Sequence, residues 1–127
     1  DPKADGWRLP TEAQWEYAAQ AGDILEFAGS DNWREVGWFP ENANQTTHSV
    51  GQQKPNQWGI YDMSGNVCEW CWNWTDDSMK TSKSYRGGSW FLSCEDGRVW
   101  TRDGQKPSYK GIDIGFRCVR ILTDVSS

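Results

Sequence analysis

The sequence feature that most constrains the fold is the tryptophan-rich stretch Trp58–Trp74. It holds four of the chain's ten tryptophans, together with Tyr61 and Met63. Burying an aromatic side chain removes about 150–250 Å² from water, which is worth about 4–6 kcal/mol. Only 36% of the 127 residues are hydrophobic, whereas 14% are aromatic, so few aliphatic side chains are available to build a core. We therefore predict a core made largely of rings, with this stretch at its centre.

Two acidic residues interrupt the stretch, Asp62 before the turn at 64–66 and Glu69 just after it. A carboxylate among tryptophans is costly to bury unless it is paired, hydrogen-bonded or bound to a cation. One hypothesis is an ion pair inside the core, for which Arg117 is the expected partner of Glu69. The other is a calcium site, because hard cations take about six to eight oxygen ligands and a glycine-containing turn can present carbonyls between two acids. Its ligands would be Asp62, Gly65, Val67 and Glu69.

The charge of the chain argues against nucleic acid as a partner. It carries 13 basic and 18 acidic residues, a formal net charge of −5, and its Lys and Arg residues do not cluster as a phosphate-binding surface requires. No run of 18 or more apolar residues is present, so we expect no transmembrane segment. The polar start of the chain, without a signal-like segment, is what an excised fragment would show.

The four cysteines are Cys68, Cys71, Cys94 and Cys118. Cys68 and Cys71 have the spacing of a zinc-binding pair, but residues three apart on a strand point to opposite faces and cannot bind one metal together. We therefore expect buried free thiols rather than zinc. His48 is the single histidine, and its place in a polar segment favours a solvated or structural role.

One amphipathic helix is predicted over about residues 11–21. Thr11 and Gln14 form a capping-box pattern at its start, apolar residues recur at helical spacing, and Gly22 is placed to end it in a left-handed conformation. Residues 23–56 have the composition of ordered loops held by isolated rings. Strands are expected at 85–90, where two glycines indicate a closely passing backbone, and at 114–122, with Phe116, Cys118 and Val119 partly buried.

Four blocks of the chain resemble the formylglycine-generating-enzyme-like, or sulfatase-modifying-factor, family. They are 6–19 (GWRLPTEAQWEYAA), 58–70 (WGIYDMSGNVCEW), 86–90 (RGGSW) and 115–118 (GFRC). The resemblance implies a variant of the C-type lectin fold: an α+β domain with a few short antiparallel strands, at least one helix and extensive ordered loops. Residues 1–127 would be the C-terminal part of one such domain, with its N-terminal part as a partner. The resemblance also implies calcium at the four ligands named above.

The family's enzyme oxidises a substrate cysteine using copper held by two cysteine thiolates, a soft ligand pair that suits Cu(I). In this chain the corresponding interval, 90–98, holds only Cys94. We therefore expect no copper and no enzymatic activity. A formylglycine-generating-type cysteine oxidase, or another enzyme of the same fold, remains the alternative.

Residues 90–117 also resemble the variable region of proteins diversified by retroelements, including the Treponema variable protein type. In these proteins a fixed frame, GSW…R…R…P…IGFR, separates positions encoded by mutable asparagine codons. That frame is present here, and all six asparagines lie at or before Asn73. Twelve residues are of types that such mutation can reach: Phe91, Leu92, Ser93, Asp96, Thr101, Asp103, Gly104, Ser108, Tyr109, Gly111, Ile112 and Asp113.

Aromatic, Ser, Gly and Asp side chains on a rigid scaffold have the composition of a binding surface. About a dozen of them could contribute on the order of 800 Å² to one side of an interface. We therefore predict a non-enzymatic module whose surface at about 91–113 binds an external macromolecule, and we expect that macromolecule to be a protein. By resemblance, the module would work at the cell surface or outside the cell. The other hypotheses for 91–113 are an ordinary surface loop and a purely architectural subunit.

Overall fold

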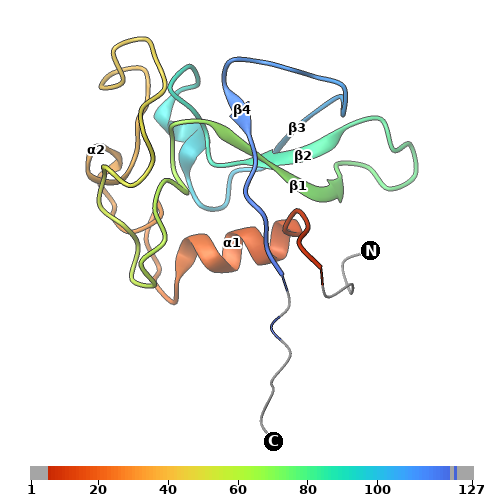
Figure 1. Ribbon diagram of the computed structural model, residues 1–127, viewed down its shortest axis with the longest axis horizontal. Coiled ribbons are helices and arrows are strands. Elements are labelled where there is room, and N and C mark those ends of the chain that lie inside the picture. Colours follow the sequence, from red (N-terminus) through yellow and green to blue (C-terminus); the bar gives the residue numbers. More distant parts are fainter. Residues whose placement is uncertain (1–5, 121, 123–127) are drawn as a thin grey trace, which may run out of the picture.

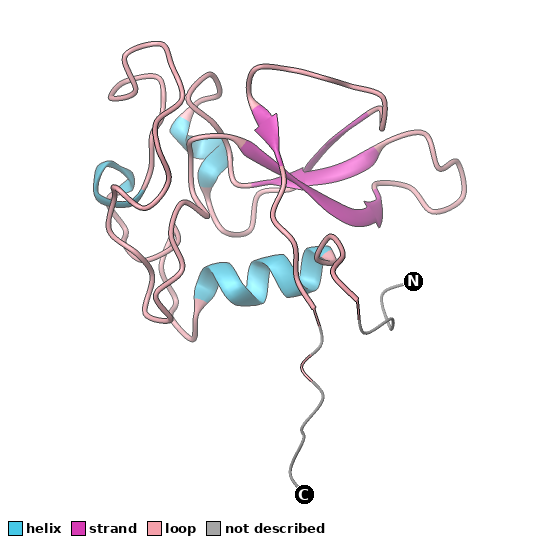
Figure 2. Cartoon of the chain, viewed as in Figure 1, coloured by secondary structure: helices cyan, strands magenta, loops and turns pink. Residues whose placement is uncertain are grey.

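The computed structural model describes residues 6–120 and 122 as a small α+β fold dominated by loops (Figure 2). The helices are α1 (Glu12–Gln20), α2 (Trp33–Val36) and a single 3₁₀ turn, η1 (Cys94–Gly97). The strands are β1 (Cys68–Trp74), β2 (Lys83–Arg86), β3 (Asp103–Gln105) and β4 (Ile114–Gly115). The predicted fold class, with few short strands, one clear helix and extensive loops, is confirmed.

The four strands form one sheet in the order β3-β2-β1-β4. The β1–β2 and β2–β3 pairs are antiparallel, but β4 runs parallel to β1, so the sheet is mixed. Figure 1 shows α1 lying along one face of this sheet, while the 106–113 segment leads from β3 to β4 at the opposite side. The sheet therefore separates a helix-covered face from a face that the 91–113 segment borders.

Helix α1 begins as the sequence predicts. The Thr11 hydroxyl accepts from the Gln14 amide, and the Gln14 side chain accepts from the Thr11 amide, 3.1 Å in each case. Its end differs by one residue, because Ala21 rather than Gly22 is the left-handed C-cap, with φ of 49°. Gly22 follows with φ of 81°, so two successive residues in this region turn the chain away from the helix.

The core lies between α1 and β1, but the tryptophan-rich stretch does not fill it. The buried cluster consists of one large ring and several smaller side chains: Trp15, Ala19, Ala28, Met63, Cys71 and Val99. Trp58 is 48% exposed and packs against Tyr17, with ring centroids 5.1 Å apart. Trp70, Trp72 and Trp74 are only half-buried. The prediction of a core centred on this stretch was wrong because β1 directs Glu69 and Cys71 toward the core, while its tryptophans alternate with them and stay half-buried.

The two remaining strand predictions need correction at their ends. The strand expected at 85–90 is 83–86, since Gly87 and Gly88 both have positive φ and leave the ladder. The closing strand is limited to 114–115, followed by an isolated bridge between Arg8 and Val119. Phe116, 69% exposed, and Cys118 face outward, because Arg117 between them turns inward and alternate residues of an extended chain point to opposite sides. Val119 is partly buried, as expected.

Candidate functional site

The buried carboxylate of Glu69 is held by an arginine and a tryptophan. Arg117 donates through Nε to Oε1 and through Nη2 to Oε2, each at 2.7 Å, and the Trp15 indole donates to Oε1 at 2.8 Å. Arg117 Nη2 also donates to the Tyr61 carbonyl at 3.0 Å. Both oxygens of Glu69 are thus engaged in a bidentate pair, the geometry in which Arg–carboxylate contacts are strongest. The predicted internal ion pair is confirmed.

Asp62 is buried in a different environment. Its Oδ2 accepts from the Gly51 amide at 2.8 Å, while Oδ1 is buried with no hydrogen-bond partner among the described residues. Asp62, Val67 and Glu69 line one cavity of about 540 Å³ together with Asn66. Gly65, the fourth predicted ligand, does not line it.

Gly65 lies instead against the Trp38 backbone, where an added Cβ would approach the nitrogen and oxygen at 2.7 Å. Within the described ranges 6–120 and 122, no three His, Cys, Asp or Glu side chains gather as a metal-binding group. A cation in the Asp62 cavity would therefore depend on backbone carbonyls in addition to its carboxylates.

The 91–113 segment starts from a rigid anchor at Ser89 and Trp90. The buried Ser89 hydroxyl accepts from the Phe91 and Leu92 amides at 3.1 and 3.0 Å. The Trp90 amide donates to the Asn66 carbonyl, and its indole donates to the Ile112 carbonyl, both at 2.9 Å. Trp90 therefore ties the beginning of the segment to its end.

Two arginines fix the middle of the segment to the helix-bearing half of the molecule. Arg98 pairs with Glu26 at 2.6 Å, and Arg102 pairs with Glu12 through two hydrogen bonds of 3.0 and 2.8 Å. Buried Arg86 supports both regions by donating to the Val99 carbonyl and to Glu16.

Sequence reasoning identified these arginines as frame residues but missed their acidic partners. The four-residue spacing of Glu12 and Glu16 on α1 could have indicated them, since residues at i and i+4 share a helix face.

None of the twelve predicted binding residues is buried. Phe91 is the most exposed aromatic residue of the set, at 63%, and Ile112 is the most exposed aliphatic residue, at 71%. The others that are exposed or half-exposed are Leu92, Ser93, Asp96, Thr101, Asp103, Gly104, Ser108, Tyr109, Gly111 and Asp113. Local contacts fix some of them: the Ser93 hydroxyl caps η1, and the Thr101 hydroxyl donates to the Glu95 carbonyl.

Two of the predicted positions restrict the side chains they can carry. A Cβ at Gly104 would collide with Thr75 and lie 3.0 Å from the Lys83 carbonyl, because β3 is packed there against β2. A Cβ at Gly111 would meet the Tyr109 hydroxyl and the Asp113 carboxylate. Larger residues at these positions require a rearrangement of their neighbours.

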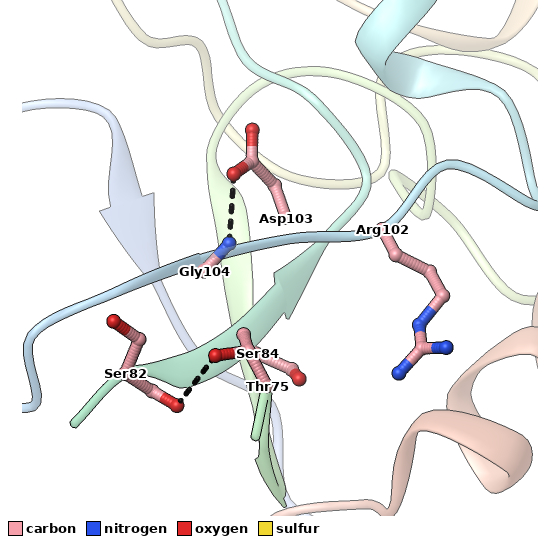
Figure 3. A pocket seen from close by; sticks show the side chains of 6 residues that line it. All are labelled: Thr75, Ser82, Ser84, Arg102, Asp103 and Gly104. Atoms are coloured by element: carbon pink, nitrogen blue, oxygen red, sulfur yellow. Dashed lines mark hydrogen bonds between the residues drawn. The ribbon is translucent and has the colours of Figure 1, made fainter. Parts of the chain in front are cut away.

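The structure gathers four of the twelve residues around one cavity of about 220 Å³. Each strand of the sheet contributes one residue to it, and the 91–113 segment supplies the rest: Cys68, Tyr85, Gln105, Ile114, Phe91, Leu92, Tyr109 and Asp113. We call this the sheet cavity. Asp103 and Gly104 instead border a separate hollow of about 470 Å³ with Thr75, Ser82, Ser84 and Arg102 (Figure 3).

The cysteines are all free. Cys68 lines the sheet cavity and Cys71 lies in the core cluster, so the pair faces opposite sides of β1 as predicted. Burial raises the pKa of both thiols, that of Cys71 to about 12 and that of Cys68 beyond the usual range. Burial also raises the pKa of half-buried Cys94. The expectation of buried thiols was wrong for Cys118, which is exposed.

His48 has the structural role expected of it. Its ring stacks on Trp38 with centroids 3.8 Å apart, and its Nε2 lies 2.6 Å from the Ala43 carbonyl oxygen. Its backbone amide and carbonyl both bond to the Asn66 side chain, at 3.0 Å.

Comparison with known proteins identifies relatives over nearly the whole chain. Residues 2–122 match the model of the sulfatase-modifying factor enzyme 1-like domain. A solved structure, Treponema denticola variable protein 1, superposes with a TM-score of 0.88 and 35% identity, covering 93% of this chain and 49% of that one. The described residues contain no helix of the length and apolar character needed to cross a membrane.

Curated relatives carry several different names. The chaperone protein LppX of Paenibacillus barcinonensis is 38% identical, over 92% of this chain and 50% of its own length. The formylglycine-generating enzyme of Streptomyces coelicolor is 32% identical, over 89% and 46%. The inactive C-alpha-formylglycine-generating enzyme 2 of Bos taurus is also 32% identical, over 89% and 44%. The chain spans about half the length of these relatives, whose names describe a chaperone, an enzyme and an inactive protein.

Proposed function

The chain belongs to the sulfatase-modifying factor enzyme 1-like family, and from this premise we propose that it is a non-enzymatic binding module. Its 91–113 surface binds a protein outside the cell or at the cell surface. The observation that carries the proposal is the division between a fixed frame and exposed side chains. Ser89, Trp90, Arg98 and Arg102 hold the backbone, while all twelve predicted binding residues remain at least partly open to solvent.

The similarity to Treponema denticola variable protein 1 supports the same conclusion. Protein rather than nucleic acid fits the charge of the chain, which is −5, and the 91–113 segment, whose four acidic and four basic residues give it no basic excess. A preorganised backbone also lowers the entropy lost when side chains bind, so a frame of this kind favours affinity.

A cysteine-oxidising enzyme is the alternative that the family and the Streptomyces coelicolor relative support. Two observations weigh against it in this chain. The 90–98 interval offers Cys94 alone, and the buried Cys68 and Cys71 have raised pKa values and lie on opposite faces of β1. Thiolates rather than thiols bind copper, so these residues are poorly suited to hold it. Incubation with Cu(I) and a cysteine-containing peptide should give no aldehyde product detectable with a hydrazide.

We also propose a calcium ion in the Asp62 cavity. The unpartnered Oδ1 of Asp62 supports it, because a buried carboxylate oxygen without a donor is costly and a cation would satisfy it. Val67 and Glu69 line the same cavity. Glu69 would have to share its oxygens with Arg117, and Gly65 could contribute only if the turn shifted.

The proposed function is tested with two display libraries of matched size. The first varies ten predicted positions, all except Gly104 and Gly111. The second varies the ten positions of the frame GSW…R…R…P…IGFR, which include Ser89, Trp90, Arg98, Arg102 and Arg117. We expect most members of the first library to fold and to yield binders to a purified probe protein such as lysozyme, with contacts mapped to 91–113. We expect most of the second to unfold.

Two results would contradict the proposal. One is a surface library that unfolds as often as the frame library, since the 91–113 residues would then be structural. The other is a set of binders whose contacts map to a different face of the molecule.

A further inference from the structure

The sheet cavity lies within the proposed binding surface, and the residues that line it indicate what enters it. We call the lining residues that come from the four strands its floor, and those that come from the connecting segments its rim; the floor is Cys68, Tyr85, Gln105 and Ile114, and the rim is Phe91, Leu92, Tyr109 and Asp113. The floor residues lie outside the twelve predicted binding positions, whereas the rim residues belong to them. At about 220 Å³ the cavity has room for one long side chain rather than for a loop.

The cavity has acidic surroundings. Asp113 is at its rim, and none of the described residues that line it is basic. Burial is the largest cause that raises the pKa of Tyr85, and the charges of Asp103 and Asp113 raise it further. Burial is also the largest cause that raises the pKa of Cys68, and the charges of Asp113, Asp96 and Asp103 add to it. Three carboxylates therefore act on the interior of the cavity, where a positive charge would be stabilised.

Asp113 is positioned to receive a donor. Its backbone carbonyl accepts from the Cys68 amide at 2.8 Å, which ties it to β1. Its Oδ1 accepts from the Tyr109 hydroxyl at 3.1 Å, while Oδ2 has no hydrogen bond to a residue in the described part of the chain. One oxygen is thus used to orient the carboxylate, and the other remains available.

We propose that the sheet cavity receives a lysine or arginine side chain presented by the partner protein. This inference rests on the proposed function and specifies the chemistry of its ligand. The apolar stem of such a side chain would pack on Phe91, Leu92 and Ile114, as long basic side chains do on apolar surfaces. Its cationic end would meet Asp113 Oδ2 and the ring face of Tyr85 or Phe91.

The test is an NMR titration of the chain with two probes that differ only in charge, Nα-acetyl-lysine methylamide and Nα-acetyl-norleucine methylamide. We expect the lysine probe to shift the amide signals of Leu92, Gln105 and Asp113. The norleucine probe should bind at least about five-fold more weakly, and added salt should weaken lysine binding. Asp113→Asn should lower lysine affinity by a similar factor. Asp77→Asn, which removes the same charge from the exposed β1–β2 loop, should not.

Equal affinity for the two probes would overturn the inference, as would lysine binding that is unaffected by salt or shifts confined to another face. The salt series uses the unaltered chain, so it remains informative if Asp113→Asn disturbs folding. The display libraries separate the two proposals. The first library alters four residues that line the sheet cavity, so the probes are tested on the unaltered chain. Binders that use 91–113, together with equal affinity of the unaltered chain for the two probes, would overturn this inference alone, and binders to a different face would overturn the proposed function.

Discussion

At the scale of single residues, Glu69 and Asp62 show two outcomes for a buried acid. Glu69 is neutralised within the protein by Arg117 and Trp15, and removing one partner of such a pair typically costs about 3–5 kcal/mol. Asp62 has one oxygen bound and one unpartnered, and its backbone has φ of 61°, a left-handed conformation in which a side chain is disfavoured. A residue kept in this state is a candidate for binding a ligand.

Asp62→Ala should abolish calcium binding, because it removes the buried carboxylate oxygen that has no hydrogen-bond partner among the described residues. Isothermal titration of the unaltered chain with CaCl₂ should show binding, and calcium at about 100 times its Kd should stabilise the fold by about 2.7 kcal/mol. Asp77→Ala, an exposed acid, is the matched control and should bind as the unaltered chain does. Absence of heat in the unaltered chain, or equal binding by Asp62→Ala, would contradict the calcium site.

At the scale of elements, the end of β2 determines where the binding segment starts. Gly87 and Gly88 both have positive φ, and Gly88 lies under the backbone of η1. A Cβ there would be 2.8 Å from the Gly97 nitrogen and 2.9 Å from its Cα. Glycine at 88 therefore lets β2 and η1 approach closely, and this approach places Phe91 and Leu92 at the rim of the sheet cavity.

Gly88→Ala should cost about 3 kcal/mol or more in the free energy of unfolding measured with urea, because the strain of a left-handed alanine adds to the overlap of its Cβ with Gly97. Gly51→Ala is the matched control, since Gly51 has φ of 78° but no atom within 4 Å of an added Cβ. It should cost only the conformational strain, about 1 kcal/mol. The Gly88→Ala cost minus the Gly51→Ala cost gives the contribution of the close contact with Gly97. Equal costs would mean that no such contact exists.

At the scale of the whole molecule, the pH dependence of stability reflects the two thiols buried by the packing of α1 and the sheet. The pKa of Cys71 rises from 9.0 to about 12, and that of Cys68 rises further. Above pH 9 the unfolded chain ionises these thiols while the folded chain keeps them protonated. Unfolding then releases protons, so stability present below pH 9 is lost as the pH rises.

Between pH 8 and pH 10, the free energy of unfolding should fall by about 1.4 kcal/mol for each of these thiols. Urea titrations should show a smaller decline for Cys68→Ala/Cys71→Ala. Cys118→Ala, which removes an exposed thiol, should behave as the unaltered chain. The variants must be compared with one another because burial also lowers the pKa of Lys83. That shift makes the free energy of unfolding rise with pH, opposite to the effect of the thiols. An unchanged decline in the double variant would show that the thiols are not responsible.

The sequence by itself determined the features that depend on neighbouring residues or on a side chain's intrinsic chemistry. The Thr11–Gln14 capping box, the close backbone approach at Gly88 and the need to neutralise Glu69 are of this kind, and the family resemblance supplied the fold class. Apart from the Glu69–Arg117 pair, only the tertiary structure decided which distant residues meet. It joined Arg102 to Glu12 across 90 positions, paired β4 parallel to β1, and assembled the sheet cavity from four strands. It also left the tryptophans of β1 at the margin of the core, because strand geometry, rather than hydrophobic area, determines which side chains face inward.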